Sequence, residues 1–306
     1  MTSLSPTHVT TEVGVPPRPR PGAATLRTIV GDWLPAVPLL ALVATMLLAP
    51  ALLLVVGSFT GTQGELTLDN WVKVINRRGD QTAIVTSITL AATVATLAAL
   101  IGAPIAWLLS RMRSVGRLAW LALLTVAGNF GGIGLGFAYF STLGGVGMVT
   151  LALQSLGLPF DPPRGASFNG LVLVFLYTNV PLYVLLVLPG MGALRDDWWE
   201  AAQVASATRA QFWRRVGIPV LLPFLAAGWL LVFTWSIGIY GLAYALAGAG
   251  AASGVQLMTL RIGSILQSDI TETWRANVLA VMLMLFAVVS LLAYRAMLRR
   301  GLRWWR

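Results

Sequence analysis

The stretch from Asp196 to Pro223 reads DDWWEAAQVASATRAQFWRRVGIPVLLP and connects two long apolar runs. Helical spacing can place Trp198, Ala202, Ala205 and Phe212 on one side of a short helix, with Glu200, Gln203 and Arg209 elsewhere on its surface. The two aspartates at its start favour a helix N-terminus, and Pro219 with Pro223 predicts a break and a restart before the next apolar run. The stretch is therefore predicted to be an ordered, amphipathic connection.

Six apolar runs, each long enough to cross about 30 Å of hydrocarbon, surround this connection. They extend over Leu34–Val56, Ala83–Leu109, Leu118–Leu143, Leu171–Leu194, Val220–Gly248 and Asn277–Leu298. The fifth run is long enough to contain a break. A weaker apolar stretch at Val146–Leu158 falls below spanning length, which predicts either an interfacial or a re-entrant helix. The expected fold is an all-α integral membrane protein with six transmembrane helices.

Composition and charge placement agree with a membrane protein. The 306 residues are 57% hydrophobic and 10% charged, whereas a soluble domain has about 25% charged residues. Apart from Arg295 near the end of the sixth run, every Lys, Arg, Asp and Glu lies outside the runs. A charge at the centre of a membrane helix costs about 2.5–3.5 kcal/mol, which explains this exclusion.

The distribution of basic residues predicts the orientation of the chain. With the N-terminus inside, 15 of the 21 Lys and Arg residues fall on the cytoplasmic side, as expected for an inner-membrane protein. Both termini are therefore predicted to be cytoplasmic. Residues 1–30 are rich in Pro and Thr and are predicted to form a disordered cytoplasmic arm. Residues 31–306 form one predicted transmembrane domain, with the connection at about 195–219.

The same composition excludes several classes of protein. The chain has no Cys, and His8 is its only His, which argues against imidazole catalysis, zinc binding and thiol chemistry. No Walker-type loop is present, and the glycines of GNFGGIGLG at Gly128–Gly136 lie inside an apolar run, where they favour close helix packing over phosphate binding. The net charge of +10 suggests nucleic acid, but its location favours the membrane. We expect no catalytic residues, no metal site and no nucleic-acid partner.

Several residues of the quoted connection keep the register of a known motif. They are Glu200, Ala201, Ala202, Ala207, Gln211, Val216, Ile218 and Pro219. In this register the connection resembles the cytoplasmic Glu-Ala-Ala motif of the type I ABC importer permeases. Two positions depart from the family pattern, because Ser206 stands where the family has Gly and Ala205 where Asp is common. If the Gly position needs a left-handed backbone, Ser would strain the turn by about 1 kcal/mol.

The resemblance extends over roughly Leu66 to the C-terminus. The second run and its exit, SITLAATVATLAALIGAPIAWLLSR at Ser87–Arg111, are similar to the corresponding family helix, and LDNWVKV at Leu68–Val74 is typical of its outer segment. Among subgroups, the layout is most similar to the permeases for polyamines, aminoethylphosphonate or ferric iron.

The resemblance implies that this connection is a coupling helix that docks on a separate ATPase subunit. The implied contact residues are Glu200, Ala201, Ala202, Ser206, Ala207 and Pro219. It further implies a second permease, identical or different, an extracytoplasmic solute-binding protein, and contact with membrane lipid. ATP and Mg would be bound by the ATPase, so the chain itself is expected to be a non-enzymatic subunit without cofactors. An amphipathic interfacial helix with aromatic anchors is the alternative interpretation.

The resemblance implies that the chain forms half of the translocation pathway for a small hydrophilic solute. Such a pathway needs polar groups within the apolar runs. The candidates are Asn129, Asn179, Trp235 and Tyr240. Hydrogen bonding to neighbouring helices is the alternative role for these side chains. Two other functions remain open, namely a secondary transporter driven by an ion gradient and an integral membrane enzyme. The first would favour ionisable residues at membrane depth, and the second would favour paired carboxylates or His near the interface.

Overall fold

The computed structural model describes residues 36–61, 64–112, 115–158, 160–248, 254–268 and 270–302. The predicted arm at residues 1–30 lies outside them. The helices of the described residues are α2 (Val37–Phe59), α3 (Asp69–Asn76), α4 (Arg78–Arg111), α5 (Val115–Asn129), α6 (Gly132–Leu143), α7 (Met148–Ser155), α8 (Phe168–Met191), α9 (Asp196–Val204), α10 (Arg209–Phe212), the π-helix η2 (Trp213–Gly217), α11 (Ile218–Gly238), α12 (Gly241–Ala247), α13 (Met258–Ser268), the 3-10 helix η4 (Ile270–Glu272) and α14 (Thr273–Leu302). Residues up to Leu52 form one unit and residues from Leu53 onward another.

Six helical segments within the described ranges are long and apolar enough to cross a membrane. They are Val37–Phe59, Arg78–Arg111, Gly132–Ser155, Phe168–Met191, Arg209–Gly238 and Thr273–Arg299. The predicted number and the all-α fold class are therefore confirmed. The break foreseen in the fifth run is also present, because α11 ends at Gly238 and α12 begins at Gly241.

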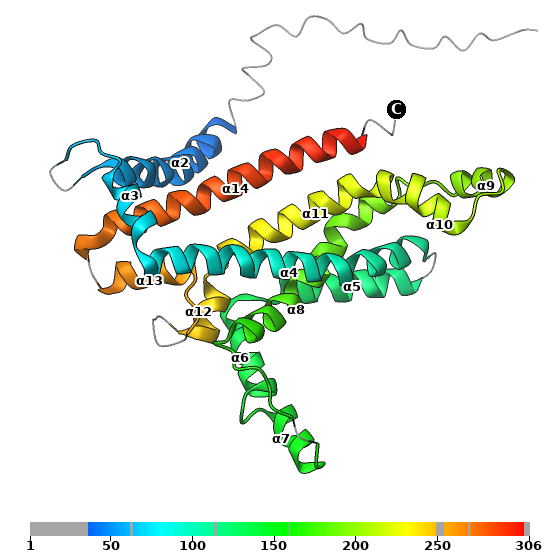
Figure 1. The fold of residues 1–306 in the computed structure, drawn as a ribbon, viewed down its shortest axis with the longest axis horizontal. Helices are drawn as coiled ribbons and strands as arrows, with labels where there is room; N and C mark the ends of the chain where they lie inside the picture. Colours follow the sequence, from blue (N-terminus) through cyan, green and yellow to red (C-terminus); the bar gives the residue numbers. More distant parts are fainter. Residues whose placement is uncertain are drawn as a thin grey trace, which may run out of the picture. The chain divides into compact units, whose positions relative to one another are not determined.

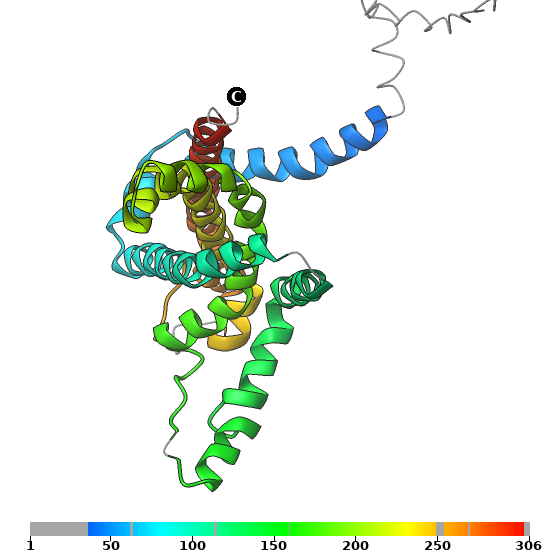
Figure 2. The ribbon, with the colours of Figure 1, turned by 90° about the vertical axis from the view of Figure 1, so that its right-hand side faces the viewer.

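The expectation of one continuous third span at Leu118–Leu143 is wrong. The chain leaves α5 at Asn129 and enters α6 at Gly132, whose φ of +67° lies in the left-handed region that favours glycine. Figure 2 shows α6 and α7 running away from the other helices of the second unit. The weak apolar stretch at Val146–Leu158 contains α7, which has 8 residues and follows α6.

The second unit is built around α4, α8 and α11. Helix α4 packs on α8 and α11, α5 packs on α8, and α14 packs on α11 (Figure 1). Glycines permit the closest approaches, because a Cβ atom at Gly102 of α4 would lie 2.7 Å from the Tyr183 ring of α8. A Cβ at Gly228 of α11 would lie 2.4 Å from a Val187 methyl group of the same neighbour. Inside a membrane, the lipid tails are as apolar as the side chains, so hydrophobic attraction does not select helix partners. Small residues such as these glycines instead let the helix backbones approach closely and pack.

The two ends of α4 define two polar regions of the second unit. With 34 residues, α4 is about 50 Å long at 1.5 Å per residue. In Figure 1 its C-terminal end lies beside α9 and α10, while its N-terminal end lies beside α3 and α13. The quoted connection and the charged residues around Asp80 are therefore on opposite ends of the bundle.

Candidate functional site

The first part of the quoted connection is α9, which ends in a left-handed turn at Ser206. Ser206 has φ +54° and is the only non-glycine residue with positive φ among the residues described. Its N–H donates to the Gln203 carbonyl at 2.9 Å, and the Ala207 N–H donates to the Ala202 carbonyl at 2.9 Å. These two bonds form a Schellman motif, in which glycine is the usual residue at the Ser206 position. The strain considered from the sequence is thus located at Ser206.

Replacing Ser206 by glycine is expected to stabilise the protein by about 1 kcal/mol, because glycine adopts the left-handed backbone without a Cβ contact. Thermal unfolding of the purified chain in detergent measures the effect. Ala205→Gly is the matched control, because Ala205 has φ −78° and gains nothing from glycine there. Equal or lower stability of Ser206→Gly would contradict a strained turn.

The second part of the connection restarts as α10 through a capping box at Thr208. The Gln211 N–H donates to the Thr208 hydroxyl at 3.3 Å, and the Thr208 N–H donates to the Gln211 side-chain oxygen at 2.9 Å. Both bonds satisfy donors that a helix start otherwise leaves without partners. The turn between α9 and α10 is therefore defined by local hydrogen bonds on both sides.

A π-helical turn joins α10 to the membrane helix α11. The Ile218 N–H donates to the Trp213 carbonyl, five residues earlier, and Pro219 follows at the start of α11. Pro219 lacks the N–H that would continue the ladder, and the wider π-helical turn before it accommodates this, so the helix continues from Arg209 to Gly238 and the expected break at Pro219 is not present. We refer to residues 196–217 as the α9–α10 segment.

Aromatic side chains hold the α9–α10 segment against the end of α4. Phe212 is buried, and its ring centroid lies 5.2 Å from that of Trp199 and 6.2 Å from that of Trp213. Trp213 in turn contacts Trp107 of α4 edge-on at 4.9 Å. Such pairs contribute about 0.5–1.5 kcal/mol each beyond the burial of area, so the segment is a well-packed structure.

The predicted coupling residues divide between the outer and inner sides of the segment. Glu200, Ala201, Ser206 and Pro219 are exposed, whereas Ala202 and Ala207 are half-buried, and Ala202 packs toward Phe212 and its neighbours. The exposed side also carries Val204, whose side chain is 89% exposed. Sequence reasoning missed Val204, although a valine among polar neighbours on a helix surface was the available signal.

Two of the four candidate pathway residues share one cavity. Asn129 and Trp235 line a space of about 320 Å³, together with Thr178 and backbone glycines including Gly131. The cavity lies where the chain breaks between α5 and α6 and between α11 and α12. Membrane transporters place irregular backbone beside a cavity because unpaired backbone groups need polar surroundings. This cavity is the candidate pathway site.

The other two candidates lie elsewhere. Asn179 is fully buried, its amide donates to the Phe175 carbonyl at 2.8 Å, and its side-chain oxygen accepts from Ser236 of α11 at 3.4 Å. Its geometry fits the alternative role of joining neighbouring helices. Tyr240 stacks on Tyr244 at 5.4 Å between ring centroids and lines a separate cavity of about 420 Å³.

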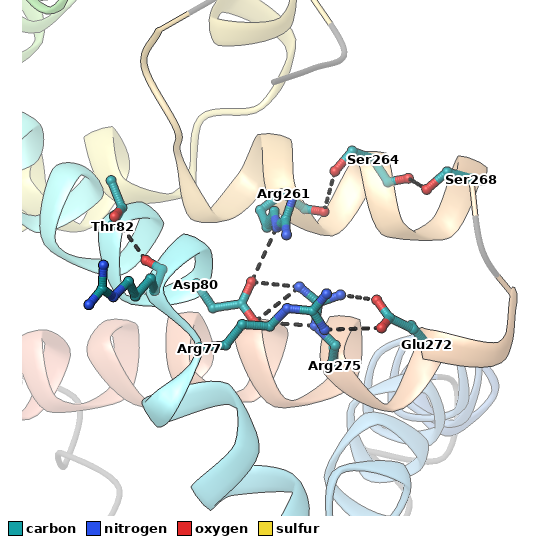
Figure 3. Close-up of polar contacts among 9 residues, drawn as sticks. Arg77, Asp80, Thr82, Arg261, Ser264, Ser268, Glu272 and Arg275 are labelled. Atoms are coloured by element: carbon teal, nitrogen blue, oxygen red, sulfur yellow. Dashed lines mark hydrogen bonds and ion pairs between the residues drawn. The ribbon is translucent and has the colours of Figure 1, made fainter. Parts of the chain in front are cut away.

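A buried charge network at the opposite end of α4 was missed by sequence reasoning (Figure 3). Asp80 is fully buried, and its carboxylate accepts hydrogen bonds from two side-chain nitrogens of Arg275, at 2.8 Å to one oxygen and 3.2 Å to the other. The Arg261 Nε donates a further hydrogen bond to Asp80 at 3.2 Å. Arg275 also forms an ion pair with Glu272, and Glu272 forms a second ion pair with Arg77 at 3.0 Å. The network joins α4, α13, η4 and α14.

The fold of the described residues defines a membrane protein with several spanning helices. No protein-family model matches the chain. The sulfate transport system permease protein CysT of Salmonella typhimurium is 33% identical over 153 residues, which cover 48% of this chain and 52% of that protein. The chain thus spans about half the length of that relative. The molybdenum transport system permease protein ModB of Mycobacterium bovis is 29% identical over 229 residues, covering 73% of this chain and 81% of that protein.

A solved structure has the same fold. The crystal structure of a bacterial alginate ABC transporter in complex with an alginate pentasaccharide-bound periplasmic protein contains a chain that matches with a TM-score of 0.64 and 16% identity. The match covers 90% of this chain and 96% of that chain. Together with the sequence relatives, it confirms the predicted resemblance: in fold and in sequence, this chain is similar to the type I ABC importer permeases. The six apolar helices that the structure describes are those of a multi-pass membrane protein, and these relatives are transport system permease proteins.

Proposed function

We propose that the chain is a permease subunit of an ATP-driven importer and that the α9–α10 segment docks on its ATPase. The observation that carries the proposal is the structure of this segment. Two short helices, joined by a hydrogen-bonded turn at Ser206, are held on the end of α4 by Phe212 and its aromatic neighbours. A segment packed in this way moves with the membrane helices when a partner moves it, because packed elements transmit displacement as units.

The proposal assigns a role to each partner. ATPase subunits bind ATP and Mg and contact the exposed side of the segment around Glu200 and Val204. A second permease, identical or different, completes the pathway, and an extracytoplasmic binding protein delivers the solute. The segment and both termini then face the cytoplasm, which agrees with the arginines at the ends of the apolar runs.

The solute is proposed to be small and hydrophilic. Polyamines, aminoethylphosphonate and ferric iron follow from the layout of the sequence, while the named relatives transport sulfate and molybdenum. The cavity at Asn129 offers amide, hydroxyl and indole groups and no charged side chain. We infer that recognition of the solute depends mainly on the binding protein, so a ligand screen of that protein is the direct way to identify the solute.

Reconstitution into proteoliposomes with the ATPase and the binding protein tests the function. Uptake is expected to require internal ATP on the ATPase side and to persist when proton and sodium gradients are collapsed by ionophores. Uptake that follows an ion gradient without ATP would instead establish the secondary transporter. Solute conversion without uptake would establish an enzyme.

The pathway site makes a separate prediction. Asn129→Phe places an aromatic ring in the cavity of about 320 Å³. The ring would displace a bound solute, and because a shift of about 1 Å in a bound molecule has large effects on rate, uptake is expected to fall at least about tenfold. Initial uptake rates at equal amounts of assembled complex measure this loss. Thr125→Phe is the matched control, because Thr125 is exposed one turn earlier on α5 and does not line the cavity. Unchanged uptake by Asn129→Phe would place the pathway elsewhere.

A further inference from the structure

Helix α3 exposes an apolar face outside the membrane-spanning segments. Leu68 at its N-cap, Val72 and Ile75 are 66%, 54% and 48% exposed. They are four and three residues apart, so they lie on one side of the helix. We refer to these three residues as the α3 apolar face. The other exposed positions of α3 are polar, namely Asp69, Lys73 and Asn76.

A buried side of α3 attaches it to the end of α2. Asn70 is buried, and its side-chain amide donates to the carbonyls of Ser58 at 3.3 Å and Thr60 at 2.9 Å. The last carbonyls of a helix lack intrahelical partners, so Asn70 supplies a partner where α2 ends. The Trp71 ring stacks on that of Phe59 at 5.6 Å between ring centroids. Helix α3 therefore lies at the level of the C-terminus of α2.

The same helix lies directly before α4. Helix α3 ends at Asn76, Arg77 has an extended backbone, and α4 begins at Arg78. Both α2 and α4 are long and apolar enough to cross a membrane, so α3 joins the ends of two spans. Exposed apolar side chains continue on either side of it along the chain, at Val56 of α2 and Val85 of α4. The level of α3 is therefore the boundary between lipid headgroups and acyl chains.

We propose that α3 is an interfacial helix whose apolar face binds the lipid surface of the outer leaflet. A helix of this kind buries its apolar face about 5–10 Å into the boundary between headgroups and acyl chains. Its polar side then faces the headgroups, where the Lys73 ammonium lies 5.8 Å from the centroid of the Trp274 ring, and tryptophan is typical of this level. The contact fixes the depth of the ends of α2 and α4. The assignment to the outer leaflet rests on the proposed function, which places the other end of α4 in the cytoplasm, whereas lipid binding itself does not.

Single cysteines test the proposal, because the chain has no Cys of its own. A nitroxide label is attached to Val72→Cys on the apolar face and, as the matched control, to Lys73→Cys on the polar side of the same helix. The full chain is inserted in vesicles of phosphatidylethanolamine and phosphatidylglycerol. Paramagnetic resonance measures collisions of each label with oxygen, which concentrates in hydrocarbon, and with a water-soluble nickel chelate. The ratio of oxygen to nickel collisions is expected to be several-fold higher at Val72 than at Lys73, and to approach that of Val85→Cys within α4.

Ile75→Cys and Asn76→Cys repeat the comparison further along α3, so the test does not depend on one variant. A high ratio on the apolar face that persists in the assembled transporter supports the lipid surface. Equal ratios on the two sides of α3 overturn the proposal. Loss of oxygen collisions at Val72 when the second permease or the binding protein is added also overturns it, because a protein then covers the face. The first comparison needs only insertion of the chain, so its failure is distinct from a failure of the importer function.

Discussion

Replacing Glu200 by arginine is expected to reduce ATP-driven uptake about 30-fold or more while the chain still folds and inserts. Glu200 is exposed on α9, so the substitution leaves the aromatic contacts of Phe212 and Trp199 unchanged. If the carboxylate pairs with a basic residue of the ATPase, the change replaces attraction by repulsion. Loss of one partner from such an interfacial pair typically costs about 2–5 kcal/mol. Uptake into proteoliposomes and co-purification of the ATPase measure the effect.

Asp161→Arg is the control for this charge reversal. Asp161 is also an exposed carboxylate, in the connection between α7 and α8, outside the α9–α10 segment. It should leave co-purification of the ATPase unchanged. If Glu200→Arg retains both the ATPase and normal uptake, the α9–α10 segment is an interfacial helix of the kind considered from the sequence, and the proposed coupling role is wrong.

Replacing Asp80 by asparagine is expected to lower the free energy of unfolding by about 3–5 kcal/mol. Asp80 is fully buried, and the side chain of Arg275 that it pairs with is only 2% exposed. Removing one member leaves the other as a buried charge without full compensation, which accounts for the size of the loss. For a chain of this size, each kcal/mol shifts the midpoint of thermal unfolding by about 2–4 °C, so a decrease of about 10 °C is expected.

Two further variants separate the effect of burial from the effect of charge on the free energy of unfolding. Arg77→Gln removes the exposed partner of Glu272, and because exposed pairs contribute about 0–1 kcal/mol, its midpoint should barely change. The double variant Asp80→Leu/Arg275→Met replaces the buried pair by apolar groups and should recover most of the stability. If Asp80→Asn unfolds at the wild-type midpoint, the network does not hold α4, α13 and α14 together.

The local features of the α9–α10 segment were largely predictable from its sequence. Its helical spacing and its initial aspartates depend on neighbours within a few positions along the chain. The position of strain at Ser206 was foreseen for the same reason, because the Gly position of the motif lies at a fixed distance from Glu200.

The break expected at Pro219 and Pro223 is wrong, because the helix continues from Arg209 to Gly238 through the π-helical turn. Helical spacing correctly placed Ala202 on the same side as Phe212, whereas Ala205, expected on that side too, is exposed because α9 ends at Val204.

The third membrane span shows why the ends of the spans were harder to predict than their number. Hydropathy over Leu118–Leu143 is continuous, since glycine interrupts a helix without lowering the apolar content of the run. The break between α5 and α6 depends on backbone conformation at Gly132, which composition does not report. The pathway cavity lies at that break, so its position could not be derived from the apolar pattern.

By itself, the sequence determined the membrane class, the number of spans and the resemblance of the α9–α10 segment to a permease motif, because these depend on side-chain polarity and on short-range spacing. Tertiary structure alone decided which polar residues meet. Asp80 and Arg275 are 195 positions apart, Asn129 and Trp235 share a cavity, and Asn179 bonds across to α11. Such contacts depend on the packing of helices distant in the chain, where close-packed glycines and alanines set the spacing and rotation of each helix. Neither polarity nor local spacing specifies that packing.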